Sequence, residues 1–228
     1  MATANDILYG PSISDDELEG LIRREPGAVK TALKTARKSV ANNAGKSAER
    51  LRAENLAMKF MPKEVQDALR NGTMTLVPYQ FFDTQVVGVA SAATLFKNQN
   101  IATGLCNVNN GKTLAGIPFV MFGLKVLSGV SATLSATDFG SPSAGVRMGE
   151  LRFMAGTVTV LDKLPTEAFN STGDNNREQG LIKVDGIYIP EQTSLEAQFN
   201  FAAALAANTN IKVIAQGIAA VAANVTRG

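Results

Sequence analysis

The chain contains 228 residues, of which 45% are hydrophobic and 18% are charged, and its formal net charge is +2. This composition can build the core of one large domain, or of one domain with an appendage, and excludes both a disordered chain and a generally polyanion-binding surface. No histidine is present, which excludes Ser-His-Asp and Cys-His catalysis and every His-ligated metal site.

Charge is distributed unevenly along the chain. Residues 1–20 carry five acids and no Lys or Arg, residues 21–70 carry twelve Lys or Arg against five acids, and residues 71–228 carry ten of each sign. The basic character therefore belongs to the N-terminal part of the sequence.

Targeting and redox signals are sparse. The single cysteine, Cys106, excludes an intrachain disulfide and is typical of folding in a reducing compartment. Neither a signal peptide nor an apolar run long enough to span a bilayer is expected from the sequence.

Residues 1–71 are predicted to form a helical, basic N-terminal arm. Residues 14–17 have the pattern of a capping box, and apolar residues follow at helical spacing up to residue 22. Residues 29–58 continue with a stripe made mostly of alanine, which Asn42, Asn43 and Gly45 break into two helices. Because short helices with a thin apolar face are marginal in water, this stripe indicates an outside partner.

The basic residues of the arm are the candidate site. They occupy the faces away from the alanine stripe and are Lys30, Lys34, Arg37, Lys38, Lys46, Arg50, Arg52 and Lys59. Three partners fit them: acidic patches on neighbouring subunits, an anionic lipid surface, or genomic nucleic acid. Residues 21–70 contain one Phe and no Tyr, so the arm offers no stacking platform for bases. A solvated basic helix without a partner is the plain alternative.

A junction separates the arm from the second part of the chain. Residues 63–69 predict a short helix, with Pro62 suited to its first position and Asn71-Gly72 as its end. Residues 72–228 then carry nearly all of the aromatic residues and are predicted to form a β-sandwich domain.

The second part contains short strand-like segments separated by Gly, Pro, Asn, Asp or Ser. The predicted strands are residues 73–82, 85–96, 119–127, 131–136, 146–153, 157–161, 181–184 with 187–189, 195–201 and 210–217. Strands in this number, without intervening helices, indicate a mainly β, antiparallel two-sheet sandwich such as a single jelly roll. The segments 98–116 and 170–180 are predicted to be loops at its ends, and residues 202–208 fit either a helical turn or a loop.

Two of these strands are the most informative. Residues 195–201 alternate between apolar and polar side chains, which predicts one face in a core and one face in water. Residues 119–127 are apolar on both faces, which predicts that one face meets the opposite sheet and the other meets the arm or a neighbour.

No motif indicates catalysis, a cofactor or a metal site. Gly45-Lys46-Ser47 and Gly111-Lys112-Thr113 both lack the first glycine of a phosphate-binding loop, and residues 174–176 lack the later ligands of a calcium loop. The carboxylates after residue 72 are interpreted as solvated strand-end and turn residues, since no spacing singles out a pair. The candidates considered for such a pair are Asp83, Asp138, Glu150, Asp162, Glu167, Asp174, Asp185, Glu191 and Glu196.

The strand rhythm of residues 116–126, 186–190 with 195–201, and 210–217 resembles that of viral jelly-roll coat proteins. This family comprises capsid proteins of icosahedral, often membrane-containing phages of the single and double jelly-roll lineage. The resemblance covers residues 73–217 and implies capsomers whose N-terminal arm lies beneath the shell, against membrane, genome or neighbours. Only one sandwich fits in the chain, which leaves a major, a vertex or a minor coat component open.

The sequence therefore predicts a non-enzymatic virion structural protein, a coat subunit that self-assembles, made in the host cytoplasm. Its expected partners are itself and other virion proteins, with anionic lipid or genomic nucleic acid at the arm. The alternatives are a phage receptor-binding or carbohydrate-binding sandwich, and a nucleic-acid-binding protein that acts through the arm.

Overall fold

The computed structural model describes residues 48–170 and 180–223, together with residue 27. The chain divides into two compact units, Met1–Arg52 and Ala53–Gly228. The predicted short helix up to residue 22 and most of the alanine stripe lie outside the described residues.

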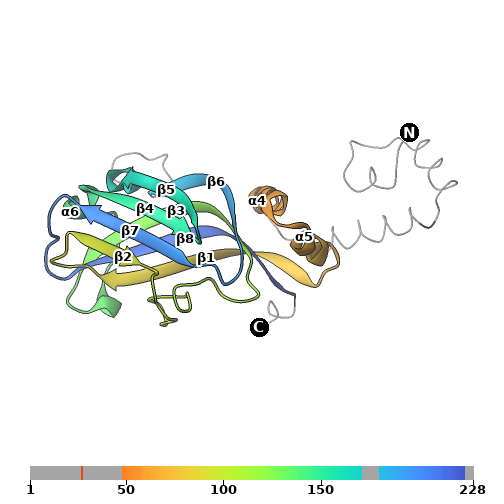
Figure 1. Cartoon of the computed structure of the whole chain (residues 1–228), viewed down its shortest axis with the longest axis horizontal. Coiled ribbons are helices and arrows are strands. Elements are labelled where there is room, and N and C mark those ends of the chain that lie inside the picture. Colours follow the sequence, from red (N-terminus) through yellow and green to blue (C-terminus); the bar gives the residue numbers. More distant parts are fainter. Residues whose placement is uncertain (1–26, 28–47, 171–179, 224–228) are drawn as a thin grey trace. The chain divides into compact units, whose positions relative to one another are not determined.

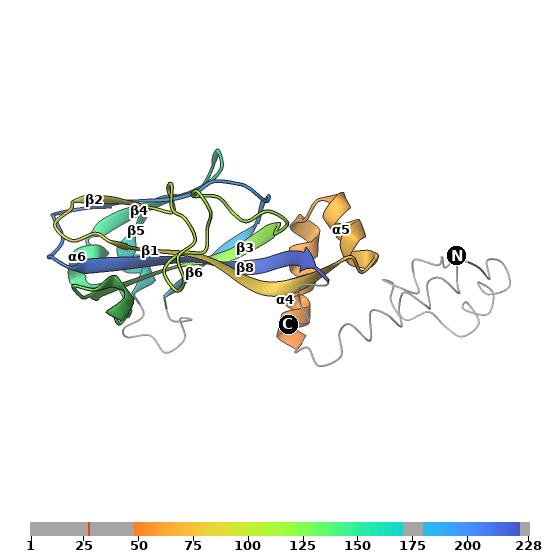
Figure 2. The same cartoon turned by 90° about the horizontal axis from the view of Figure 1, so that it is seen from below.

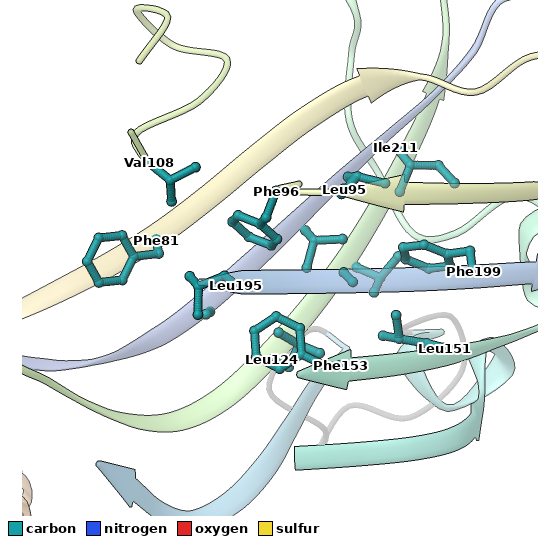
Figure 3. Close-up of a cluster of buried hydrophobic side chains, with 14 of the residues drawn as sticks. Phe81, Leu95, Phe96, Val108, Leu124, Leu151, Phe153, Leu195, Phe199 and Ile211 are labelled. Atoms are coloured by element: carbon teal, nitrogen blue, oxygen red, sulfur yellow. The ribbon is translucent and has the colours of Figure 1, made fainter. Parts of the chain in front are cut away.

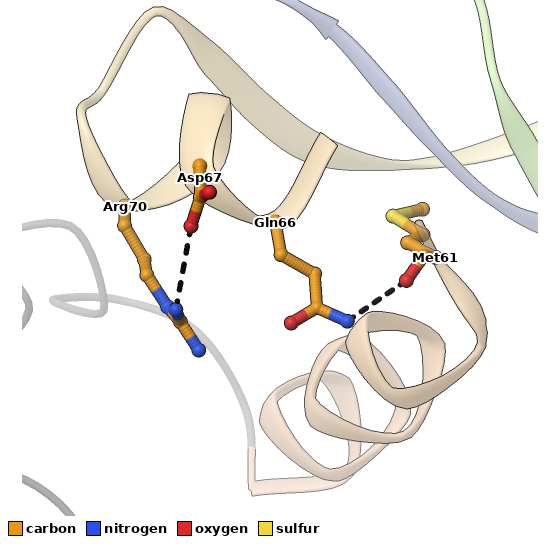
Figure 4. A network of polar contacts seen from close by, with 4 residues as sticks. All are labelled: Met61, Gln66, Asp67 and Arg70. Atoms are coloured by element: carbon orange, nitrogen blue, oxygen red, sulfur yellow. Dashed lines mark hydrogen bonds and ion pairs between the residues drawn. The ribbon is translucent and has the colours of Figure 1, made fainter. Parts of the chain in front are cut away.

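The described part of the arm consists of two helices, α4 (Ala48–Phe60) and α5 (Lys63–Arg70). Pro62 is the N-cap of α5, one position before the place predicted for it, and Asn71 is the C-cap. Gly72 follows with a φ of 73°, a conformation that glycine adopts without strain, so the chain turns here into the first strand. Figure 4 shows the contact that orients α5 on α4, a hydrogen bond of 2.8 Å from Gln66 Nε2 to the Met61 carbonyl oxygen.

Eight strands follow within the described residues. They are β1 (Met74–Val86), β2 (Ala92–Leu95), β3 (Phe119–Val130), β4 (Gly149–Ala155), β5 (Val158–Pro165), β6 (Leu181–Ile189), β7 (Leu195–Phe201) and β8 (Thr209–Ala222). Three short helical segments lie between them: η1 (Leu134–Ala136), α6 (Ala144–Arg147) and η2 (Thr166–Phe169).

The strands form two antiparallel four-stranded sheets with the orders β1-β8-β3-β6 and β2-β7-β4-β5. The pairing is nested: the first strand pairs with the eighth, the second with the seventh, the third with the sixth and the fourth with the fifth. The pairings of β3 with β8 and of β4 with β7 join these pairs into the two sheets, which lie face to face (Figures 1 and 2).

The main core fills the space between the two sheets, as Figure 3 shows. The β2-β7-β4-β5 sheet contributes the apolar side chains of β7 to this core. Apolar and polar residues alternate along β7, so Leu195, Ala197 and Phe199 are almost completely buried while Asn200 is exposed. From the other sheet, the Phe81 ring meets the Phe119 ring edge to face, with centroids 5.2 Å apart. Burying an aromatic or aliphatic side chain of this size contributes roughly 1.5–3 kcal/mol each, so this core is the main source of stability.

A second, smaller cluster lies on the outer face of the β1-β8-β3-β6 sheet. Ala57 and Met61 pack there against Val120 of β3 and Ile218 of β8, and Val65 and Leu69 of α5 join them. The prediction that residues 119–127 are covered on both faces is confirmed at Val120, where the described helices of the arm provide the second cover. Further along the strand, Lys125 and Leu127 on the same outer face are only partly buried.

Two strand predictions were wrong. Residues 131–136 form a bend and the 3-10 helix η1, since their alternating apolar face consists of two alanines and Leu134 and offers little side chain to bury in a core. The prediction for residues 85–96 runs across a corner: β1 continues to Val86, and β2 begins only at Ala92. Gly88 occupies this corner because a Cβ there would lie 2.6 Å from the backbone nitrogen of Asn208.

The predicted end loops are described in part. Residues 98–116 lie between β2 and β3 without a further strand, as predicted, and are fixed to the β6–β7 turn by hydrogen bonds such as Thr113 N to the Thr193 carbonyl oxygen, 2.9 Å. Residues 202–208 form a loop rather than a helical turn. Most of the segment 170–180 lies outside the described residues.

Candidate interaction surfaces

The predicted basic site is described for three of its eight residues. Lys30, Lys34, Arg37, Lys38 and Lys46 lie outside the described residues. Arg50, Arg52 and Lys59 belong to α4, where Arg52 and Lys59 are exposed and Arg50 is partly buried. Seven residues are close to two helical turns, so Arg52 and Lys59 project from the same side of α4 and Arg50 from the opposite side.

Asp83 is a buried structural carboxylate, which corrects its interpretation as a solvated residue. Its side chain accepts hydrogen bonds from the backbone N–H of Thr84 at 2.9 Å, from Gln85 Nε2 at 2.7 Å and from the backbone N–H of Phe96 at 2.6 Å. The residue is only 1% exposed. A carboxylate enclosed by three donors cannot reach a substrate in solvent, so Asp83 fixes the start of the β2–β3 loop against β1.

Cys106 lies next to Asp83 and is also buried. Burial raises the pKa of the Cys106 thiol to about 11, and the nearby Asp83 carboxylate acts in the same direction. The thiol therefore stays protonated at neutral pH, and a protonated, buried thiol is not a nucleophile.

Asn107 closes part of the free edge of β1. Its Nδ2 donates to the Gln80 carbonyl oxygen and its Oδ1 accepts from the Phe82 backbone N–H, both at 2.7 Å. The Asn107 side chain thus takes the place of a neighbouring strand. Because unpaired edge groups are what a second chain would pair with, this stretch of β1 is closed to strand addition.

One end of the sandwich carries a group of exposed apolar side chains, which we call the apolar tip: Val86, Val89, Val130 and Met148. Their side chains are between 58% and 74% exposed. All four surround the β7–β8 loop. Val86 and Val130 pair with Asn210 and Thr209 at the start of β8, the Val89 N–H donates to Leu205, and the Met148 carbonyl accepts from Ala202.

The apolar tip is extended by small residues. Five alanines of the β7–β8 loop, Ala202, Ala203, Ala204, Ala206 and Ala207, are exposed beside it. The tip lies at the end of the sandwich that carries α6, and Figure 1 shows α5 at the other end. Contiguous exposed apolar groups of this kind are typical of surfaces that meet another molecule.

The loops of the opposite end are bonded to one another, and Val158 at the β4–β5 turn is an exposed apolar side chain there. Thr113 is completely buried and donates its hydroxyl to the Pro190 carbonyl oxygen at 3.0 Å, while it accepts from the Thr193 N–H at 3.0 Å. The Asn100 side chain accepts from the Asn110 N–H at 3.1 Å. These loop side chains hold one another, and the two ends of the sandwich therefore differ in character.

A basic surface lies on the outer face of the β1-β8-β3-β6 sheet, and we call it the lysine face. Lys125 on β3, Lys183 on β6 and Lys212 on β8 project from it. The strand register places Phe82, Ile214, Lys125 and Leu181 in one row across the four strands, so these side chains share this face. The Lys212 ammonium sits 4.7 Å from the ring centroid of Phe82 and 5.9 Å from that of Phe139.

Sequence reasoning missed the lysine face. The alternation of Lys212, Ile214 and Gln216 with buried residues was visible in residues 210–217. What the sequence did not contain was the strand order that brings Lys125 and Lys183 beside them.

No group of three or more His, Cys, Asp or Glu residues that could hold a metal ion occurs within residues 48–170 and 180–223. In the same part of the chain, no helix has the length and apolar character needed to cross a membrane. No protein-family model matches the chain, and comparison with curated proteins found no significant match.

Proposed function

We propose that the chain is a virion structural protein, a coat subunit with one jelly-roll domain that self-assembles into a shell. The observation that carries this proposal is the nested strand pairing, which gives the sheet orders β1-β8-β3-β6 and β2-β7-β4-β5. Eight strands rolled into two four-stranded sheets in this way are the architecture of a jelly roll, which is common in viral capsid proteins.

A fold alone does not define a function, and the apolar tip gives the proposal its second support. Covering a side chain as exposed as Val89 or Val130 in an interface contributes about 1 kcal/mol or more. Several such side chains on each subunit favour association, and interface centres are typically depleted of charge. We place the apolar tip between neighbouring subunits of the shell.

In this proposal the partners are further copies of the chain and other virion proteins, and the protein is made in the host cytoplasm before it enters the virion. The basic residues of the arm would contact neighbouring subunits, membrane or genome. The carbohydrate-binding alternative would place its ligand on the loops 98–116 or 170–180. In the first loop, Asn100 and Asn107 are already engaged within the protein, and most of the second lies outside the described residues, so no observation favours that alternative.

The test is assembly of the purified full chain, measured by light scattering after size-exclusion chromatography and by electron microscopy. We expect particles or regular oligomers, and we expect Val130→Asp to raise the concentration needed for assembly by about tenfold or more, because it places a charge in the interface. Val158→Asp is the matched control, since Val158 is 58% exposed and lies on β5, away from the apolar tip.

A chain that stays monomeric at high concentration would contradict the proposal. Equal effects of Val130→Asp and Val158→Asp would show that the apolar tip is not the contact between subunits.

A further inference from the structure

We propose that the lysine face binds the acidic segment of residues 14–22 from a second copy of the chain. This inference deepens the proposed self-assembly and rests on it. It starts from the lysines: the ion pairs found among the described residues join other side chains and involve neither Lys125 nor Lys212. Two ammonium groups on one sheet face thus lack an acidic partner within the described part of the chain.

The lysine face also offers apolar contact. Phe82, Leu127 and Ile214 lie between the lysines and are only partly buried. This strip of sheet is limited on both sides. Toward one end, the small cluster of Ala57 and Ile218 covers the same sheet face, and toward the other the Phe139 ring reaches over Lys212. Figure 2 shows α4 and the green loop containing η1 on this side of the sheet.

The covers at the two ends of this strip limit the kind of molecule that can bind between them. A planar bilayer would meet the covers at both ends before it reached Lys125. A single-stranded nucleic acid that stacks its bases on aromatic rings would need free ring faces, and the Lys212 ammonium already occupies one face of Phe82. A short peptide segment with acidic and apolar side chains fits both the size and the chemistry of the strip.

The chain itself contains such a segment. Residues 14–22 (SDDELEGLI) carry four acids together with Leu18, Leu21 and Ile22 at helical spacing, and residues 1–20 contain no Lys or Arg. Residues 21–70 carry twelve Lys or Arg against five acids, so they would be repelled by the lysine face. Within the first 70 residues, residues 14–22 are thus the part that combines negative charge with an apolar stripe.

The length of chain outside the described residues allows the contact to be made between copies. Residues 23–47 separate the acidic segment from the start of α4. A linker of this length spans roughly 40 Å as a helix and about 80 Å when extended. In an assembly of the proposed kind, an arm with this reach arrives at the sheet of a neighbouring subunit.

The test is disulfide cross-linking in the full chain, with Leu21→Cys in the acidic segment and Gln216→Cys on the lysine face. The matched control combines Leu21→Cys with Val158→Cys, an exposed position on the other sheet. Under mild oxidation we expect a ladder of covalent oligomers on a non-reducing gel for the first pair and not for the control. A fast-migrating monomer with an internal disulfide, or equal ladders for both pairs, overturns the inference.

Charge reversal gives an independent measurement. Lys125→Glu with Lys212→Glu should lower the rate of cross-linking about tenfold, and adding Asp15→Lys with Glu19→Lys should restore it. An unchanged rate overturns the inference. If particles form without this cross-link, only the binding of residues 14–22 to the lysine face is refuted. If cross-linked oligomers form but never become particles, the proposed shell is refuted and the binding of residues 14–22 to the lysine face stands.

Discussion

At the scale of single residues, Cys106 is placed where its ionisation is disfavoured. Burial raises the pKa of its thiol from the ordinary 9.0 to about 11, which is a difference of two pH units and lowers the thiolate fraction at pH 8 about 100-fold. We expect iodoacetamide to label the native chain at pH 8 at least about 100-fold more slowly than the chain unfolded in guanidinium, as measured by mass spectrometry.

The unfolded chain is the internal control for this prediction, because it contains the same single cysteine. Comparable labelling rates in both states would show that the Cys106 thiol is accessible and ionised in the native protein.

Asp83 shows what a sequence cannot say about a single carboxylate. Its neighbours Phe82 and Thr84 are those of an ordinary strand, and nothing in the sequence around it indicates that the Phe96 N–H and the Cys106 thiol will come within contact. These contacts bring in two residues of the β2–β3 loop that lie 13 and 23 positions further along the chain. Burial of this carboxylate therefore depends on the tertiary fold and on no local pattern.

At the scale of the elements, a strand prediction was correct where the alternating positions carried large apolar side chains. Residues 195–201 alternate without interruption, and β7 has these bounds. Residues 131–136 contain one large apolar side chain, Leu134, and they are not a strand. The sheet orders could not be predicted, since pairing of β1 with β8 joins residues more than 120 positions apart and leaves no local signal.

The basic site of the arm stays a prediction. Charge density located the arm, because Lys and Arg can be counted directly, but only Arg50, Arg52 and Lys59 of the eight candidates belong to the described residues. The apolar tip was not predicted, since Val86 and Val130 lie at strand ends whose exposure depends on where the loops pack.

The packing of α4 on the sheet makes a specific prediction. Ala57 is completely buried in the small cluster with Val120 and Ile218. Ala57→Glu would force a carboxylate between these apolar side chains, and we expect it to lower the free energy of unfolding by about 2–4 kcal/mol. Denaturant unfolding followed by circular dichroism measures this difference.

Asn55→Glu is the matched control, because Asn55 is exposed on the same helix and should change the free energy of unfolding by less than about 0.5 kcal/mol. If Ala57→Glu were equally mild, α4 would not be held on the outer face of the sheet in solution.

At the scale of the whole molecule, the described helices and the sandwich share buried surface. The sequence predicts a boundary after residue 71, with residues 72–228 able to fold alone. In the structure the compact unit begins at Ala53, and α5 and the end of α4 cover Leu76, Val120, Ile218 and Ala220. Removing the chain before α4 should therefore impair assembly alone, whereas removing α4 and α5 as well should also lower the stability of the sandwich.

Two truncations separate these effects. A chain that starts at Ala48 keeps both helices, and we expect its thermal unfolding temperature to match that of the full chain while its assembly is impaired by loss of the arm. A chain that starts at Gly72 uncovers the small cluster, and four such side chains correspond to about 4 kcal/mol or more of lost stability. Calorimetry measures the unfolding temperature of each truncated chain, and binding of a hydrophobic dye reports whether the small cluster is uncovered. If the two truncations had the same unfolding temperature, the helices would contribute nothing to the sandwich, and the boundary after residue 71 would hold for stability as well as for sequence character.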